Sequence, residues 1–332
     1  MEFLGVTDVD DLVRKDPRTI EQQIIDYIIS LNAKGLSRAT KVLRLAAVVA
    51  FYSINDITLN RKKLGKFLGP KQKLVKDRPY TLEEISQMLK VSDERMKAIV
   101  LILTSTGMRL GGLVSLKISN IQKIEEYNLY KITVYEGSAE EYICFTTPEA
   151  GAAIDFYLYL RQRCGEKIRP SHPLIRNEFN HLDSFSMSYP KHIRRKSYDS
   201  AIQNMLEQSG VIRVEHRIEI EKEGINNSNN YRNRKEVART TGFRKLANTT
   251  MKRCKVDPLI KEMLLGHHTG LEENYYRPEE QDLLNEYLKC VDYLTVNNEF
   301  RLKRQVETLT IEKSKVEAAL TRIDDLYKKL GL

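Results

Sequence analysis

The feature that most constrains the fold is a Gly69-Pro70 break, which separates two stretches of helical periodicity. A chain of 332 residues has room for two domains. We therefore predict four segments: a helical N-terminal domain over 1–70, a basic linker over 71–80, a larger domain over 81–290, and a C-terminal helix over 291–332.

The N-terminal segment is predicted to hold two main helices. Apolar residues from Ile20 to Leu31 recur at helical spacing, and Gly35 ends that stripe. Ser37 is a capping residue for the next helix, which is apolar on most sides. A short third element follows over 61–68. These elements predict a small helical domain.

The second segment is predicted to be mainly helical, with a β-hairpin. Thr81 and Glu84 have the spacing of a capping box at the start of a helix. The runs YKITVYEG and EYICFTT are β-branched and aromatic, and Gly137-Ser138 joins them as a hairpin. The Asn-rich run over 224–234 predicts a surface loop, either disordered or touching a nucleic acid. The fold class is therefore mainly α with one small antiparallel β-sheet (α+β).

The last segment carries a heptad repeat. Its apolar residues follow alternating spacings of three and four, with Lys313 as the one polar break. These seam residues are Leu302, Val306, Leu309, Val316, Leu320, Ile323, Tyr327 and Leu330. The alternatives are a lone amphipathic helix lying on the body of the protein and a self-associating coiled coil. Dense charge between the seam positions favours the coiled coil.

Composition indicates a globular protein with a polyanionic partner. The hydrophobic fraction of 41% and charged fraction of 30% are ordinary for a globular domain. The formal charge of +9 favours nucleic acid through phosphate neutralisation. No apolar run approaches the roughly 20 residues of a membrane span. The acidic N-terminus lacks the pattern of a signal peptide, so we expect a cytoplasmic protein with no membrane partner.

The chain shows no pattern of a metal site. Its four cysteines, Cys144, Cys164, Cys254 and Cys290, lie far apart and form no CxxC pair. No cluster that combines Asp, Glu and His residues stands out as a set of metal ligands. We therefore expect no metal and no cofactor.

The stretch between Arg61 and Arg78 is strongly basic, with Asp77 as its single acid. It is either a solvated linker or a segment that follows a DNA backbone, and both interpretations remain open. The residues that we expect to contact DNA are Lys62, Lys63, Lys66, Lys71, Lys73, Lys76, Arg78 and Lys245.

Three short stretches carry candidate catalytic residues. STGMRLGGLVSL places Arg109 at a helix start, and TTGFRKLANTT places Arg244 in the first turn of another helix. LGHHTGLEENYYRP adds paired histidines and paired tyrosines. In this order and spacing the stretches resemble the active-site boxes of the tyrosine recombinases (the phage-integrase superfamily). GFRK and YYRP are most similar to archaeal and archaeal-virus members. The resemblance covers roughly residues 77–285, and the helices and linker before it fit the position of that family's core-binding domain.

The resemblance implies a role for each residue. The nucleophile lies nine residues after the box histidine, which selects Tyr276 when counted from His267. Tyr275 is then expected to pack in a core, although a slip of one residue in this loop would exchange the two tyrosines. Arg109 and Arg244 would clamp the phosphate, because planar guanidiniums stay charged and offer parallel donors. His267 would donate a hydrogen bond to the same phosphate or orient the tyrosine.

Three positions depart from the family pattern. Thr241 stands where the second box has a histidine, and it cannot carry a proton near neutral pH. The hairpin turn lacks the lysine that protonates the leaving 5′ oxygen, so Lys131 on the preceding strand is the nearest substitute. Gly112 stands where an acidic residue often supports the first arginine. Losing a general acid typically costs about 10²–10⁴ in rate, so reduced activity is possible.

The resemblance implies a site-specific DNA recombinase or integrase. It would cut and rejoin double-stranded DNA at an attachment site through a 3′-phosphotyrosine link, without metal or ATP. The family acts as a tetramer on DNA, and the heptad helix could contribute to that assembly. Such a protein would be nucleoid-associated. The alternative is a cleavage-deficient DNA-binding relative that serves as a regulator or structural subunit, which the absent lysine and Thr241 favour.

Overall fold

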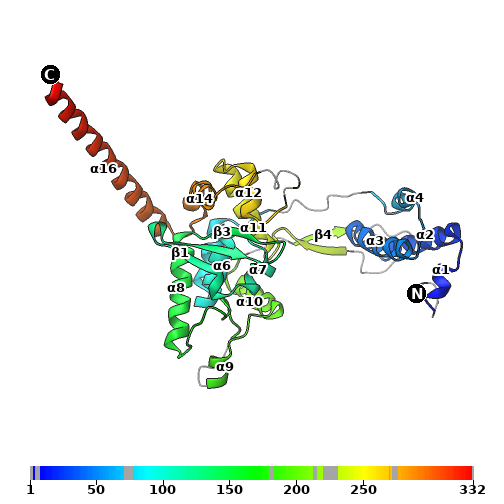
Figure 1. Cartoon of the computed structure of the whole chain (residues 1–332). Helices are drawn as coiled ribbons and strands as arrows, with labels where there is room; N and C mark the ends of the chain where they lie inside the picture. Colours follow the sequence, from blue (N-terminus) through cyan, green and yellow to red (C-terminus); the bar gives the residue numbers. More distant parts are fainter. Residues whose placement is uncertain are drawn as a thin grey trace. The chain divides into compact units, whose positions relative to one another are not determined.

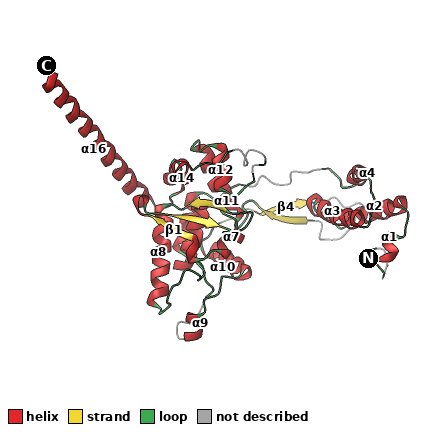
Figure 2. Cartoon of the chain, in the orientation of Figure 1, coloured by secondary structure: helices red, strands yellow, loops and turns green. Residues whose placement is uncertain are grey.

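The computed structural model describes residues 3, 8–70, 78–178, 183–211, 215–219, 231–268, 270 and 276–330. The chain forms two compact units, 1–76 with 214–236, and 77–213 with 237–332. Helices dominate both the sequence-coloured view (Figure 1) and the view coloured by secondary structure (Figure 2). The prediction of a mainly helical chain with one small antiparallel sheet is confirmed for the larger unit.

The first unit contains four short or medium helices. They are α1 (Asp10–Val13), α2 (Pro17–Ala33), α3 (Arg38–Ile54) and α4 (Arg61–Lys66). Asp16 caps α2 by accepting the backbone N–H groups of Arg18 and Thr19, and Ser37 caps α3 as predicted. The apolar stripe of α2 is buried against α3 and α4 in one hydrophobic cluster. Both predicted helices and the short third one are therefore confirmed.

The same unit includes a two-stranded ribbon that the sequence did not predict. Strand β4 (Glu215–Glu219) pairs antiparallel with β5 (Tyr231–Lys235). The predicted loop over 224–234 is therefore wrong at its end, because 231–234 belong to β5. Residues 224–230 lie outside the described part of the chain. Asn and Arg are poor strand formers, so only pairing with β4 reveals β5.

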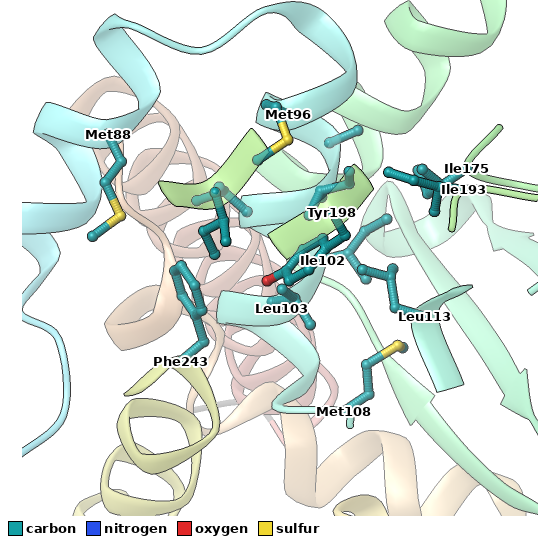
Figure 3. Packing of buried hydrophobic residues seen from close by; sticks show 14 of the residues in the cluster. Met88, Met96, Ile102, Leu103, Met108, Leu113, Ile175, Ile193, Tyr198 and Phe243 are labelled. Carbon is teal, nitrogen blue, oxygen red and sulfur yellow. The ribbon is translucent and has the colours of Figure 1, made fainter. Parts of the chain in front are cut away.

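The second unit is built around helix α6 (Glu94–Thr106), which is buried along most of its length. The other described helices of this unit before the last one are α5 (Leu82–Lys90), α7 (Leu110–Ser115), α8 (Pro148–Arg163), α9 (Ser184–Ser188), α10 (Arg195–Gln208), α11 (Thr241–Arg253), α12 (Pro258–Leu264), α14 (Glu280–Leu288) and α15 (Val291–Leu294). Figure 3 shows Ile102 and Leu103 of α6 among side chains of other elements, including Tyr198 and Phe243. The predicted Thr81–Glu84 capping box opens α5.

One antiparallel sheet in this unit has the order β1-β2-β3. Strands β2 (Leu129–Val134) and β3 (Tyr142–Phe145) form the predicted hairpin, with Ile132 opposite Cys144. Two 3₁₀ turns, Ile118–Asn120 and Glu125–Tyr127, flank β1 (Ile121–Ile124). The sequence analysis missed β1, since a four-residue strand with two polar positions lacks a clear alternating pattern.

The last helix, α16 (Asn298–Leu330), covers the predicted heptad segment. Its start is fixed to the second unit, because buried Glu149 accepts the N–H groups of Val296 and Asn297. Burial raises the pKa of the Glu149 carboxyl, and the two backbone hydrogen bonds lower it in part. None of the helices described is long and apolar enough to cross a membrane.

Candidate active site

Arg109 lies at a sharp junction between two helices. Helix α6 ends at Gly107, whose φ of 62° suits glycine. A Cβ on Gly107 would lie 2.8 Å from the Ala247 Cβ, so the end of α6 packs tightly against α11. Arg109 then occupies the N-cap position of α7, and its exposed side chain donates from Nη1 to the Gly266 carbonyl at 2.8 Å.

Arg244 approaches the same turn from helix α11. Its half-buried guanidinium donates from Nη1 to the Gly107 carbonyl at 2.8 Å and from Nη2 to the Leu265 carbonyl at 2.6 Å. Burial lowers the pKa of Arg244, and the like charge of Arg109 lowers it further. No carboxylate in the described chain forms an ion pair with either arginine, so both guanidiniums are held by neutral groups.

A glycine turn at the end of α12 presents His267 to this pair. The His267 N–H donates to the Glu262 carbonyl at 2.9 Å, and the Gly266 N–H donates to the Met263 carbonyl at 2.9 Å. Gly266 has a φ of 62°. This pattern is a Schellman motif, which turns the chain back over the last turn of the helix. The Leu-Gly-His sequence therefore positions the histidine and the two carbonyls together.

The partners of His267 assign its tautomer. Nε2 lies 2.7 Å from Arg244 Nη2, and since a guanidinium can only donate, Nε2 accepts. Nδ1 therefore carries the proton and donates to the Glu262 carboxylate. Burial opposes ionisation of Glu262, but hydrogen bonds from Lys261 and His267 outweigh it and lower the pKa of Glu262. The sequence analysis missed Glu262, because this contact exists only once the turn has formed.

The β2–β3 hairpin contributes a second residue that the sequence analysis missed, Tyr142. Its ring packs directly on Gly266, where an added Cβ would lie 2.6 Å from Tyr142 Cδ1. The buried hydroxyl is close enough to Arg244 for a polar contact, but it makes no hydrogen bond of standard geometry. Burial raises the pKa of Tyr142, and the charges of Arg244 and Arg109 oppose that rise. Its only signal in the sequence is its place in the hairpin.

Tyr135 explains the glycines that follow Arg109. A Cβ on Gly111 would lie 2.9 Å from the Tyr135 hydroxyl, and one on Gly112 would lie 2.7 Å from a methyl group of Val134. The hairpin therefore covers the first turn of α7 closely. An acidic side chain at position 112 has no space in this arrangement, which accounts for that departure from the family pattern.

The structure also places Lys131 and Thr241, the two residues that concern proton transfer. Lys131 forms an ion pair with Glu280 at 2.9 Å, and its side chain is only 17% exposed. Thr241 is the first residue of α11 and is exposed. Neither Lys131 nor Thr241 takes part in the contacts that link Arg109, Arg244 and His267.

Tyr276 is placed after α12, and its side chain is 42% exposed. No contact among the described residues joins Tyr276 to the two arginines or His267. Tyr275 lies outside the described residues, as does most of the loop over 269–275. His268 is described and exposed.

The predicted DNA-contacting residues fall into four groups. Lys62 and Lys66 of α4 are exposed, whereas Lys63 also pairs with Glu21 at 2.8 Å. Arg78 forms a bidentate ion pair with Glu84, with its shorter contact at 2.8 Å. Lys245 is half-buried beside Arg244 on α11. Lys71, Lys73 and Lys76 lie outside the described residues.

Solved structures with the same fold include site-specific recombinases and integrases. The XerH site-specific recombinase bound to palindromic difH substrate, a post-cleavage complex, matches with a TM-score of 0.53 and 14% identity over 90% of this chain and 73% of that chain. The Tn1549 transposon integrase in complex with a circular intermediate DNA matches with a TM-score of 0.51 and 15% identity over 81% and 84%. No protein-family model and no curated protein matches the chain.

These matches define the class of protein through its fold. The chain has the fold of DNA-recombining enzymes that include recombinases and integrases. This fold agrees with the one that the resemblance of the three motifs predicted.

Proposed function

We propose that this protein is a site-specific DNA recombinase or integrase that works through a 3′-phosphotyrosine intermediate, of the archaeal or archaeal-virus type. The observation that carries the proposal is the pair of guanidiniums on one glycine turn, beside His267 and without a carboxylate partner. Two cations held only by neutral groups form a site for an anion. The fold likeness makes a DNA phosphate the natural anion.

A bound phosphate would replace the carbonyl partners of the arginines. The Gly266 and Leu265 carbonyls satisfy the guanidiniums in the free protein, so neither charge is left unsolvated. A phosphodiester offers charged oxygens to the same donors, and such charge-assisted bonds are stronger than neutral ones. In the transition state negative charge grows on the non-bridging oxygens, where positioned donors stabilise it most.

Tyr276 would supply the nucleophile. Its hydroxyl oxygen would form a bond to phosphorus while the bond from phosphorus to the 5′ oxygen breaks, which leaves a 3′-phosphotyrosine and a free 5′ hydroxyl. The bond energy is retained in the intermediate, so rejoining requires no ATP. In the free protein His267 Nε2 is an acceptor. Once Arg244 turns to the phosphate, Nε2 could take the tyrosine proton, with Glu262 holding the ring.

The partner would be double-stranded DNA carrying an attachment site, and the active assembly would be a tetramer on that DNA. The net charge of +9 and the exposed lysines of α4 support DNA binding. We propose a cytoplasmic, nucleoid-associated protein on the same grounds. The basic segment over 71–80 would contact the DNA backbone.

A suicide-substrate assay tests the proposal. Sites selected by the protein from a random duplex library would be nicked near the cleavage point, so that the released fragment diffuses away and the covalent adduct accumulates. Wild-type protein should form the adduct, and Tyr276→Phe should form none. If Tyr275→Phe removes the adduct and Tyr276→Phe does not, the nucleophile is Tyr275 and the function stands.

One observation supports a second candidate, a DNA-binding relative that no longer cleaves. Lys131 is engaged by Glu280, and the hairpin turn over 135–141 holds no lysine. Tight binding to the selected duplex with no adduct at any pH between about 6 and 9, a range that spans histidine titration, would establish that candidate instead.

A further inference from the structure

The hairpin whose turn lacks a lysine places a buried hydroxyl near the arginine pair. Tyr142 is the first residue of β3, and its ring covers Gly266, whose carbonyl accepts from Arg109. Its hydroxyl lies within electrostatic range of both Arg109 and Arg244. No other tyrosine hydroxyl in the described chain is both buried and without a hydrogen bond of standard geometry.

A buried hydroxyl whose proton has no acceptor is costly. Leaving such a group unsatisfied is destabilising, and a phenylalanine would fill the same space without that penalty. The cost is recovered only if the hydroxyl gains an acceptor in another state of the protein. The two nearby guanidiniums can only donate, so the proton needs another acceptor, and an anion bound by both arginines would supply one.

We infer that the Tyr142 hydroxyl is a catalytic donor to the phosphodiester that Arg109 and Arg244 hold. From the start of β3, Tyr142 would donate the hydrogen bond that a lysine in the hairpin turn would otherwise supply. This role rests on the proposed function. When Arg109 exchanges the Gly266 carbonyl for a phosphate oxygen, an oxygen of the same phosphate would accept the hydrogen bond from the Tyr142 hydroxyl.

The chemistry of a phenol suits the leaving oxygen. Burial keeps Tyr142 protonated at neutral pH, because it raises the pKa of the hydroxyl, so it can donate. A phenol is a stronger acid than the alcohol that forms when an alkoxide gains a proton, so proton transfer from the phenol to the leaving oxygen is favourable. As the bond from phosphorus to the 5′ oxygen breaks, the Tyr142 proton can pass to that oxygen. Solvent or the His267 side chain would restore the proton before the next turnover.

The variant Tyr142→Phe tests this role with little change in packing. Removing one donor to a developing oxyanion typically lowers the rate by about 10²–10³, so adduct formation in the suicide-substrate assay should slow by that factor. Duplex affinity should stay within about threefold, because one hydrogen bond contributes little to a contact made by many phosphates. Tyr135→Phe is the matched control from the same hairpin and should cleave near the wild-type rate.

Each outcome of the assay decides the inference. Equal rates for Tyr142→Phe and wild type would overturn it while leaving the proposed function intact. The absence of adduct with wild type would overturn the proposed function and this role together. An equal slowing by Tyr135→Phe would show that hairpin packing, and not the Tyr142 hydroxyl, is responsible.

An independent observation concerns helix α16, whose heptad seam is exposed. The five apolar seam residues with described side chains are between 55% and 63% exposed: Leu302, Val306, Leu309, Val316 and Leu320. A 33-residue helix is about 50 Å long. An apolar stripe of that length on a single helix requires a partner helix in water.

The charges on α16 determine whether a second copy of the same helix packs parallel or antiparallel to it. In a parallel pair Lys313 would face Lys313 of the second copy in the core, and Glu312 would face Glu317. The seam from 302 to 327 has the same spacings when it is counted from either end. An antiparallel pair therefore aligns 302 with 327 and places Lys313 beside Val316.

The antiparallel alignment also places opposite charges beside each other. It brings Lys303 beside Asp324 of the second copy, which is an attractive contact that occurs twice. Lys313 can keep its ammonium at the helix edge, since it already lies 3.8 Å from Glu317 of its own helix. We propose that α16 joins two copies of this chain as an antiparallel coiled coil.

Cysteine cross-linking of the full-length protein tests both the pairing and its direction. Variants Leu302→Cys and Tyr327→Cys, of different tagged size and in a Cys164→Ser background, would be oxidised alone and as a mixture. The mixture should give a cross-linked heterodimer, and Leu302→Cys alone should give none, because its two copies would lie about 37 Å apart along the helix axis.

Self-linked Leu302→Cys without the heterodimer would overturn the direction. The absence of any cross-link would overturn the pairing. Sedimentation supplies a second readout that does not depend on the introduced thiols. The double variant Leu309→Glu/Leu320→Glu should shift the mass from dimer to monomer, and an unchanged mass would overturn the pairing as well.

Discussion

Two arginine pairs in the same unit show how the surroundings of a charge determine its role. Arg161 and Arg176 are buried around Glu166, with contacts of 2.5 Å and 2.6 Å to its carboxylate. Arg109 and Arg244 reach one glycine turn and contact carbonyl oxygens and a histidine. The first pair already has its anion. The second pair has the geometry of an anion site and only neutral partners.

The difference teaches that burial alone does not indicate a functional arginine. Arg161 is 2% exposed and is the more buried residue, yet its donors are taken up by Glu166 and by the carbonyls of Pro173 and Leu174. Arg109 is exposed and makes one hydrogen bond to a neutral group. A ligand can displace that single bond at little cost, whereas displacing Glu166 would leave buried charges unpaired.

The largest expected effect comes from removing the anion of the buried pair. Glu166→Ala should lower the free energy of unfolding by about 3–5 kcal/mol, because two buried guanidiniums lose their counter-charge. Urea denaturation measures this. The control is Glu178→Ala, whose carboxylate pairs with Arg95 but is 85% exposed. The control should change stability by at most about 1 kcal/mol. Equal losses would show that the buried network does not stabilise the fold.

Removing the exposed arginine should affect chemistry and leave stability nearly unchanged. Arg109→Ala should slow adduct formation by about 10²–10³, as expected for loss of a donor to the transition state. Its unfolding free energy should fall by no more than about 1.5 kcal/mol, the value of one hydrogen bond. The control Arg253→Ala removes an exposed charge from the end of α11. A destabilisation as large as that of Glu166→Ala would mean that the two pairs are equivalent.

The turn at Gly266 tests the comparison of the two arginine pairs further, because the carbonyls of this turn are neutral partners of Arg109 and Arg244. Gly266→Ala should be strained at φ 62° and should also collide with the Tyr142 ring. Gly137→Ala is the matched control, since its φ is 76° but an added Cβ meets nothing within 4 Å. The collision should cost about 1–3 kcal/mol beyond the control in urea denaturation. Equal costs would show that Tyr142 does not brace the turn.

The pH dependence of stability gives the smallest effect. Burial alone would raise the pKa of Glu166, but hydrogen bonds from Arg161 and Arg176 outweigh it and lower the pKa. A lowered pKa contributes stability that is present above the unfolded value near 4.5 and is lost as pH falls through the folded value. The difference in stability between wild type and Glu166→Ala should therefore be constant near neutral pH and shrink below about pH 4.5. A difference that grows on acidification would contradict this assignment.

Much of the fold could be predicted from local chemistry. Ser37, Thr81 and Gly35 marked helix ends correctly, because capping and glycine turns depend on neighbours in the chain. The strand β5 could not be predicted in the same way, since its composition is that of a loop and its pairing with β4 is not local. Short strands are defined by partners more than by propensity.

The candidate site was predictable only in part. Arg109, Arg244 and His267 were found from motif spacing, and their contacts now link them. Glu262 and Tyr142 were missed, because one depends on the turn that ends α12 and the other on the register of a hairpin. Their importance arises from three-dimensional packing that no short sequence pattern records.

The most direct measurement is a crystal structure of the Tyr276→Phe variant bound to its selected duplex. The central claim predicts one backbone phosphate within about 3 Å of guanidinium nitrogens from both Arg109 and Arg244, with the Arg109 bond to Gly266 broken. Arg161 and Arg176 should still enclose Glu166. A complex in which both exposed arginines remain on their carbonyls, with every phosphate elsewhere, would contradict the account.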